Sequence, residues 1–258
     1  MSGQVINPQK STIYGGSISQ SRQTTIANSL GFTVGTLPFL YLGVPIFKGK
    51  PKTVYFQPVV DKIKSKLTSW KASLLSYVGR SQLLKSVILS MTIYSITIYA
   101  WPVSLIKQLE RLMRNFLWSG NFENKKLVTI SWKVVCSPIK EGGFGLRSLS
   151  KFNEASSLKL GWELMHSQDQ WASFLRRRVK RGKHSLQYHI YSSIWSGIKE
   201  YMQVISENST WLLGNGNSIN FWLDNWCGDT LVNLLNIPPN LHHHLKVYVS
   251  DFIHDFQW

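Results

Sequence analysis

Apolar residues recur at steps of three and four in three consecutive segments of the first half of the chain, a spacing that places them on one face of an α-helix. The first segment comprises Phe56, Val60, Ile63, Leu67, Trp70 and Leu74; the second Leu84, Val87, Ile88, Met91 and Tyr94; the third Leu105, Leu109, Leu112, Met113, Phe116 and Leu117. The pattern predicts three amphipathic helices that form a small bundle at the centre of the chain.

The junctions between these segments carry residues that end and start helices. Gly79 is expected to cap the C-terminus of one helix, and Ser81 to cap the N-terminus of the next. Pro102 precedes the third segment, and Gly120 follows it. Short connections of this kind are typical of a small helical bundle.

The segments outside the bundle predict short strands and further helices. Residues 1–50 are punctuated by glycine, and the apolar run 37–46 contains a glycine and two prolines, which predicts an edge strand or hairpin. Residues 121–150 indicate a loop-rich connector. A helix is expected from an N-cap at Asn153 to His166, a short one over 171–179, and a hairpin over 211–222 turning at Asn215-Gly216. The predicted fold class is mainly α with small β elements.

Composition indicates a folded, strongly basic protein. The hydrophobic fraction of 43% is sufficient for a core, and the net charge of +16 favours polyanionic partners, either nucleic acid or an anionic membrane. Two cysteines far apart in the sequence do not suggest a disulfide framework, and no signal peptide is evident, so an intracellular location is expected. No small-molecule substrate is evident.

One uncharged stretch has the length of a membrane span. Residues 86–106 contain no charged side chain, but they carry several Ser and Thr residues and are interrupted by Pro102. A buried bundle helix followed by a turn is therefore favoured, and membrane association is the less favoured alternative.

Patterns typical of catalytic or metal sites are weak in this sequence. The glycines at 142, 143 and 145 lack the Lys-Ser/Thr of a phosphate-binding loop and predict a tight turn. His242, His243 and His244 are adjacent, so their side chains diverge rather than converge on one metal ion. The sequence predicts no catalytic residue, no metal site and no cofactor.

Basic side chains supply the candidate binding residues. Lys62 and Lys66 lie on one flank of the first helical stripe, whereas Lys64 and Lys71 lie on the other, so the four cannot face one duplex together. The cluster from Arg176 to His184 has three interpretations: a solvated surface, a nucleic-acid contact, or a nuclear-import signal.

Several sequence blocks resemble one family. The blocks are SGQVINPQKS at 2–11, FLYLGVP at 39–45, YVGRSQLLKSV at 77–87, GGFGLR at 142–147, and WLLGNGNSI at 211–219 with FWLDNW at 221–226. In this order they resemble the region that follows the catalytic aspartates in non-LTR retrotransposon reverse transcriptases of the plant LINE type. The resemblance implies the end of a polymerase palm at 1–50, a helical thumb at 51–120 and an α+β connector at 121–258.

The resemblance also implies what this chain does not supply. The family's Asp-Asp turn, whose carboxylates hold Mg²⁺, precedes the first block, and these 258 residues contain no Asp-Asp pair and no carboxylate before Asp61. The expectation is a polymerase fragment that is inactive alone but binds RNA/DNA primer–template; the alternative is a decayed retroelement product without a selected function. The candidate nucleic-acid-binding residues are Lys62, Lys66, Arg80, Lys85, Arg111, Arg114, Arg176, Arg177, Arg178, Lys180, Arg181 and Lys183.

Overall fold

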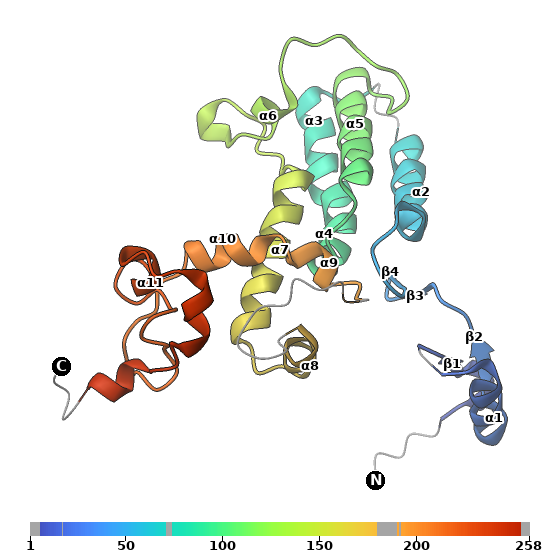
Figure 1. Ribbon diagram of the computed structural model, residues 1–258. Helices are drawn as coiled ribbons and strands as arrows, with labels where there is room; N and C mark the ends of the chain where they lie inside the picture. Colours follow the sequence, from blue (N-terminus) through green and yellow to red (C-terminus); the bar gives the residue numbers. More distant parts are fainter. Residues whose placement is uncertain (1–5, 17, 71–73, 180–189, 191, 254–258) are drawn as a thin grey trace. The chain divides into compact units, whose positions relative to one another are not determined.

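The computed structural model describes residues 6–16, 18–70, 74–179, 190 and 192–253 (Figure 1). It divides into two compact units, Met1–Lys199 and Glu200–Trp258. The fold is mainly α, and its two small sheets have two strands each, which confirms the predicted fold class. The unit boundary falls inside the region 121–258 that the sequence analysis treats as one connector.

The first unit begins with a small β–α–β element. The 3-10 turn η1 (Pro8–Lys10) leads to β1 (Thr12–Tyr14), which pairs in parallel with β2 (Thr33–Gly35). Helix α1 (Gln20–Leu30) joins them, capped by Ser19 at its start and by Gly31, at φ 68°, at its end. This helix was not predicted from the sequence, because α1 has no apolar stripe. Its buried residues are Gln23 and Ala27.

The predicted hairpin is confirmed. Strands β3 (Phe39–Tyr41) and β4 (Val44–Ile46) pair antiparallel and are joined by Leu42 and Gly43. Both joining residues have positive φ, 50° and 82°, as the central residues of a type I′ turn require. Val44 enters the main core, and the Phe47 ring stacks on Tyr55 with a centroid distance of 4.6 Å.

The predicted bundle is also confirmed, with one helix longer than expected. It consists of α2 (Thr53–Ser69), a continuous helix Tyr77–Ile98 and α5 (Val103–Ser119). The continuous helix comprises α3 (Tyr77–Leu83), the π-helical turn η3 (Leu84–Ile88) and α4 (Leu89–Ile98). The α3 and α5 helices pack side by side (Figure 1). Large apolar side chains of all three helices are fully buried, among them Phe56, Ile63, Leu84, Leu109 and Phe116.

The predicted break at Gly79 and Ser81 is wrong. Ser76 caps the start of the helix, and its hydroxyl accepts a hydrogen bond from the Gly79 amide at 3.2 Å. The Ser81 hydroxyl donates instead to the carbonyl of Val78, one turn back, at 2.8 Å. Leu74 is likewise outside α2 and is 80% exposed, because α2 ends at the extended residue Trp70. An earlier serine therefore fixes the helix start.

Within the described residues, one helix, Tyr77–Ile98, is long and apolar enough to cross a membrane, judged by length and composition alone. A buried helix of a globular protein meets the same criterion. Leu84, Ile88 and Ile96 on this helix belong to the main hydrophobic core. Packing against the other bundle helices accounts for the buried part of this apolar helix.

The remainder of the first unit consists of α6 (Trp132–Val135), η4 (Ile139–Glu141), α7 (Leu149–His166), α8 (Gln170–Val179) and α9 (Trp195–Ile198). Ser148 caps α7, so the predicted cap at Asn153 is wrong. Asn153 is buried within α7, and its side chain bonds both the amide and the carbonyl of Trp101, at 2.8 and 3.3 Å. The glycine turn after η4 is confirmed by positive φ at Gly142 and Gly145.

The second unit consists of short elements: α10 (Tyr201–Glu207), α11 (Leu231–Leu234), η5 (Pro239–His244) and η6 (Val249–Phe252). The predicted hairpin over 211–222 is wrong. The Phe221 amide donates to Val247, and the Val249 amide donates to Ile219, both at 2.9 Å. Asn220 forms a bridge with Tyr248. The strand partner is thus a distant segment rather than the one across the Asn215-Gly216 turn.

Candidate nucleic-acid interface

A hollow of about 930 Å³ lies between α2, α5 and the loop that follows α5. Five basic side chains line it, and Glu123 is the carboxylate among its lining residues. The basic residues are Lys64 from α2, Arg111 and Arg114 from α5, and Lys125 and Lys126 from the loop. We call this site the basic hollow. Cations from three separate segments converge on it.

The amphipathic pattern of α5 positions its two arginines. Leu109, Leu112 and Met113 face the core, so Arg111 and Arg114 are left on the exposed flank of the helix. The Arg114 guanidinium lies over the Trp132 ring, 5.8 Å from its centroid. A cation–π contact of this kind orients the side chain while its charge stays accessible.

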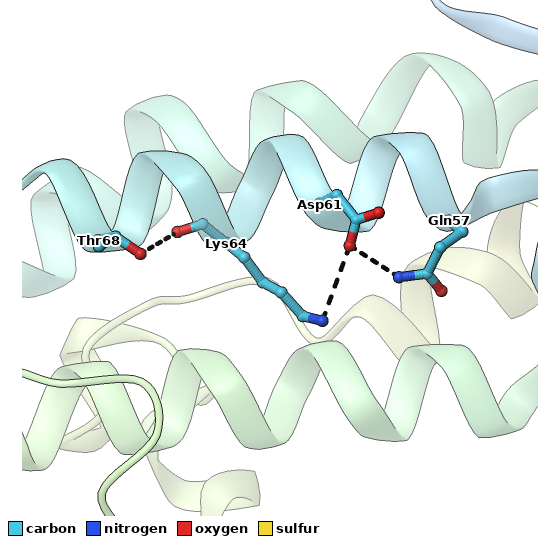
Figure 2. A network of polar contacts seen from close by, with 4 residues as sticks. All are labelled: Gln57, Asp61, Lys64 and Thr68. Atoms are coloured by element: carbon cyan, nitrogen blue, oxygen red, sulfur yellow. Dashed lines mark hydrogen bonds and ion pairs between the residues drawn. The ribbon is translucent and has the colours of Figure 1, made fainter.

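Lys64 enters the hollow from α2. Its ammonium group lies 3.8 Å from an Asp61 carboxylate oxygen, and the Gln57 amide donates to the same oxygen at 2.8 Å (Figure 2). The Asp61 side chain is 59% exposed. Because solvent screens such exposed pairs, Asp61 holds Lys64 only weakly and leaves its charge available to an anionic ligand.

The loop after α5 is attached at both ends. The Asn115 side-chain amide donates to the Phe122 carbonyl at 2.9 Å, and the Ser119 hydroxyl donates to the Asn121 carbonyl. At the far end Ser131 caps α6, and Trp132 is buried. Lys126 donates to the Tyr77 hydroxyl at 3.4 Å. These contacts hold the loop cations on the same side of the bundle as α5.

The structure separates the other predicted bundle residues from the basic hollow. Lys62 lines a different hollow, of about 320 Å³, with Leu40, Leu42 and Tyr94. Arg80 donates to the Leu117 carbonyl at 3.1 Å and lies 5.4 Å from the centroid of the Tyr77 ring. The first of these contacts ties the start of the long helix to the end of α5.

Two further predicted lysines also lie outside the hollow. Lys66 is exposed on α2. Lys85 is half-buried, with its ammonium nitrogen beside Gly145. Of the six predicted bundle residues, Arg111 and Arg114 are thus the pair that the structure brings together in the basic hollow.

The three arginines at the end of α8 differ in their contacts. Arg176 donates to the Leu164 carbonyl at 2.7 Å and to the Ser173 hydroxyl at 3.2 Å, so it fastens α8 to α7. Arg177 is exposed, and the Arg178 guanidinium lies 5.6 Å from the Phe174 ring centroid. The predicted residues Lys180, Arg181 and Lys183 lie outside the described residues.

Sequence reasoning missed three residues of the hollow. Lys64 was placed correctly on the flank of α2 opposite Lys62, but nothing in the helical pattern indicates which flank faces α5. Lys125 and Lys126 were interpreted as part of a polar turn, because nothing in the local sequence indicates that the loop folds back beside the bundle. The signal that was available is that they follow the amphipathic helix that carries Arg111 and Arg114.

A second hollow, of about 780 Å³, shares Trp132 with the first and contains Cys136. The pKa of the Cys136 thiol is raised to about 11, mainly by burial and also by the nearby Glu110 carboxylate, whereas Lys151 and Arg114 oppose the shift. Glu110 itself accepts hydrogen bonds from the Ser148 hydroxyl and the Ser150 amide at the start of α7. A thiol held neutral in this way is a poor nucleophile. Among the described residues, no group of three or more His, Cys, Asp or Glu side chains could hold a metal ion.

Charge is distributed very unevenly between the two units. Residues 200–258 carry six carboxylates and a single Lys or Arg, Lys246. All the other Lys and Arg residues, out of 29 in the chain, belong to residues 1–199. Nearly all of the positive charge of the chain therefore lies in the first unit.

The fold and this surface define a basic, mainly α-helical protein, and comparisons with known proteins place it beside two plant proteins. The chain is 31% identical, over 75% of its length, to an Arabidopsis thaliana protein named "Putative ribonuclease H protein", of which it spans about a third (32%). It is 25% identical, over 55% of its length, to an uncharacterized mitochondrial protein of the same plant, of which the match covers 95%. No protein-family model matches the chain.

Proposed function

We propose that this chain is the nucleic-acid-binding part of a plant retroelement-derived protein, corresponding to the thumb and connector of a reverse transcriptase, and that it binds primer–template through the basic hollow. The order of the resembling sequence blocks and the similarity to a plant protein named for ribonuclease H support the origin. The polymerase chemistry is not assigned to this chain.

The convergence of Lys64, Arg111 and Arg114 with the loop lysines carries the proposal. Each Lys or Arg that neutralises a phosphate releases condensed counterions, so affinity depends steeply on salt. A net charge of +16 attracts any polyanion, whereas the cations clustered in the hollow define where on the protein a nucleic acid would bind.

The experiment compares two double variants that remove equal charge from the full-length chain. Fluorescence anisotropy with a labelled 20-base-pair RNA/DNA hybrid measures the Kd across a salt series. R111Q/R114Q should weaken binding by about tenfold or more and flatten the slope of log K against log salt by about 2, because about one unit of slope is lost per phosphate contact.

K62Q/K66Q is the matched control, because both lysines are on α2 but Lys62 lines a different hollow. It should change the Kd by less than about threefold, through the loss of general charge alone. Equal losses in the two variants would show that charge acts without a defined site. Absence of salt-dependent binding in the unmodified chain would refute the function itself.

A further inference from the structure

We infer that the basic hollow accommodates the bases of a single-stranded nucleic acid, and does not merely contact the phosphates of a duplex. This inference rests on the proposed function and specifies its ligand. Three features of the hollow carry it: its apolar wall, its unpaired backbone and its concave shape.

The wall of the hollow exposes aliphatic side chains directly beside its cations. Leu127 follows Lys126 and is 97% exposed, and Ile130, three residues later, is 45% exposed. Phosphate oxygens gain nothing from aliphatic contacts, because they remain hydrated or bonded to cations. The flat faces of bases do gain, since they are apolar surfaces that leave water when they pack.

The same segment presents unpaired backbone groups. Within the part of the chain that the structure describes, no hydrogen bond is made by the backbone amides or carbonyls of residues 125–130. The segment is neither helix nor strand, although its two ends are fastened at Phe122 and Ser131. Backbone donors and acceptors in a row are available to the edges of bases that are not already paired with a complementary strand.

The concave shape discriminates between the two kinds of nucleic acid. A duplex presents its phosphates on a convex surface and keeps its bases stacked inside, so the exposed apolar wall of the hollow remains uncovered when a duplex binds. A single strand turns its bases outward, where they stack on aromatic rings and on guanidinium planes. Half-buried Phe122 and the Arg114 guanidinium, backed by Trp132, line the hollow.

The test measures single-strand and duplex binding by the same full-length protein. The probes are a labelled 20-nucleotide oligo(U), a labelled 20-nucleotide oligo(dT) and, as the duplex, the labelled 20-base-pair RNA/DNA hybrid, each at about 150 mM salt. Either single strand should bind at least about fivefold more tightly than the duplex. The variant L127S/I130S should weaken single-strand binding by about five- to tenfold and duplex binding by less than about twofold, because it removes apolar surface that only an exposed base would cover.

The control variant is L212S, which removes a leucine that is 92% exposed in the second unit. It should leave all three affinities unchanged, and circular dichroism should show both variants folded. Duplex binding as tight as single-strand binding, or equal losses on both probes in L127S/I130S, would overturn the inference while the proposed function stands. No binding of any probe would instead overturn the proposed function.

Discussion

In the first unit, large apolar side chains are fully buried and the charged groups stay outside, whereas in the second unit polar side chains close the loops. Phe56, Leu109 and Phe116 have no exposed surface in the bundle. In the second unit, Asn220 accepts from the amides of Trp222 and Leu223 and donates to the Leu245 carbonyl. The Trp226 indole donates to the Phe221 carbonyl at 2.8 Å.

The difference extends to charge. Carboxylates of the second unit accept from backbone amides: Asp224 from Asn220, Asp229 from Thr230, and Asp251 from Tyr248. Cations of the basic hollow, by contrast, sit on the flank of a helix whose stability comes from its other face. Charge in the second unit therefore maintains structure, and charge in the hollow is available for a ligand.

The largest expected effect comes from the bundle core. Phe116→Ala should lower the free energy of unfolding of the first unit by about 3–5 kcal/mol, because it removes a fully buried ring and leaves a cavity. Urea unfolding, monitored by hydrogen exchange with mass spectrometry, measures the stability of each unit separately. Amides of residues 200–253 should keep their protection, and an equal loss there would mean that the units unfold together. Phe174→Ala, at a ring that is 63% exposed, is the control.

The next effect tests the polar construction of the second unit. Asn220→Ala removes three hydrogen bonds of the side chain and should destabilise that unit by about 2–3 kcal/mol. The same hydrogen-exchange measurement should show faster exchange over 219–249 and no change in the bundle. Unchanged exchange over 219–249 would show that the amide network is dispensable.

One cysteine in each unit gives a chemical comparison. Cys136 is half-buried and has its pKa raised to about 11, whereas Cys227 is exposed. At pH 8, only about one Cys136 thiol in a thousand is ionised, so iodoacetamide should modify Cys227 far faster in the folded protein. Peptide mass spectrometry over a time course measures both rates. Equal rates would contradict the burial of Cys136.

The raised pKa also predicts the sign of a pH effect. Below the ordinary cysteine pKa of 9.0, the Cys136 thiol is neutral in both the folded and the unfolded chain. Its ionisation therefore takes nothing from the stability of the fold in that pH range. Between pH 9 and about 11, the unfolded chain ionises first, so stability is lost as pH rises. Cys136→Ala should remove that part of the alkaline destabilisation of the first unit. Identical alkaline profiles for the two proteins would contradict it.

The smallest expected effect concerns the pair in Figure 2. Asp61→Asn removes an exposed carboxylate 3.8 Å from the Lys64 ammonium group and should change stability by less than about 0.5 kcal/mol. It should also strengthen binding of an RNA/DNA hybrid slightly, by less than about threefold, because a negative charge is removed beside the hollow. Weaker binding in this variant would show that Asp61 is needed to position Lys64.

Much of the fold could be predicted because regular spacing and strong breakers are local signals. The stripes on α2 and α5, Gly120 at a C-cap, and the proline-containing hairpin at 39–46 were all recognised this way. Helix α1 was not predicted because its buried residues are Gln23 and the small Ala27, which form no apolar stripe. Gln23 donates to the carbonyls of Ile13 and Gly35. A polar residue whose hydrogen bonds are satisfied by distant backbone leaves no local pattern.

The candidate site was predicted only in part. Arg111 and Arg114 could be named because they interrupt a clear apolar face, whereas the contribution of Lys64, Lys125 and Lys126 depends on which surfaces meet. Arg176 was predicted to bind nucleic acid because it belongs to a basic cluster in the sequence. In the structure its guanidinium instead donates to the Leu164 carbonyl. Charge can be counted along the chain, but its availability depends on neighbours that are distant in sequence.

By itself, the sequence determined the mainly α fold class, the three bundle helices, the tight turn at 142–145 and the strongly basic character. Each of these depends on residues within a few positions of one another, or on composition alone. Only the tertiary structure decided that the long helix passes through Gly79, that Asn153 bonds Trp101, and that residues 219–221 bond 247–249. The physical reason is that buried polar groups must be satisfied, and their partners are supplied by whichever distant segment packs against them.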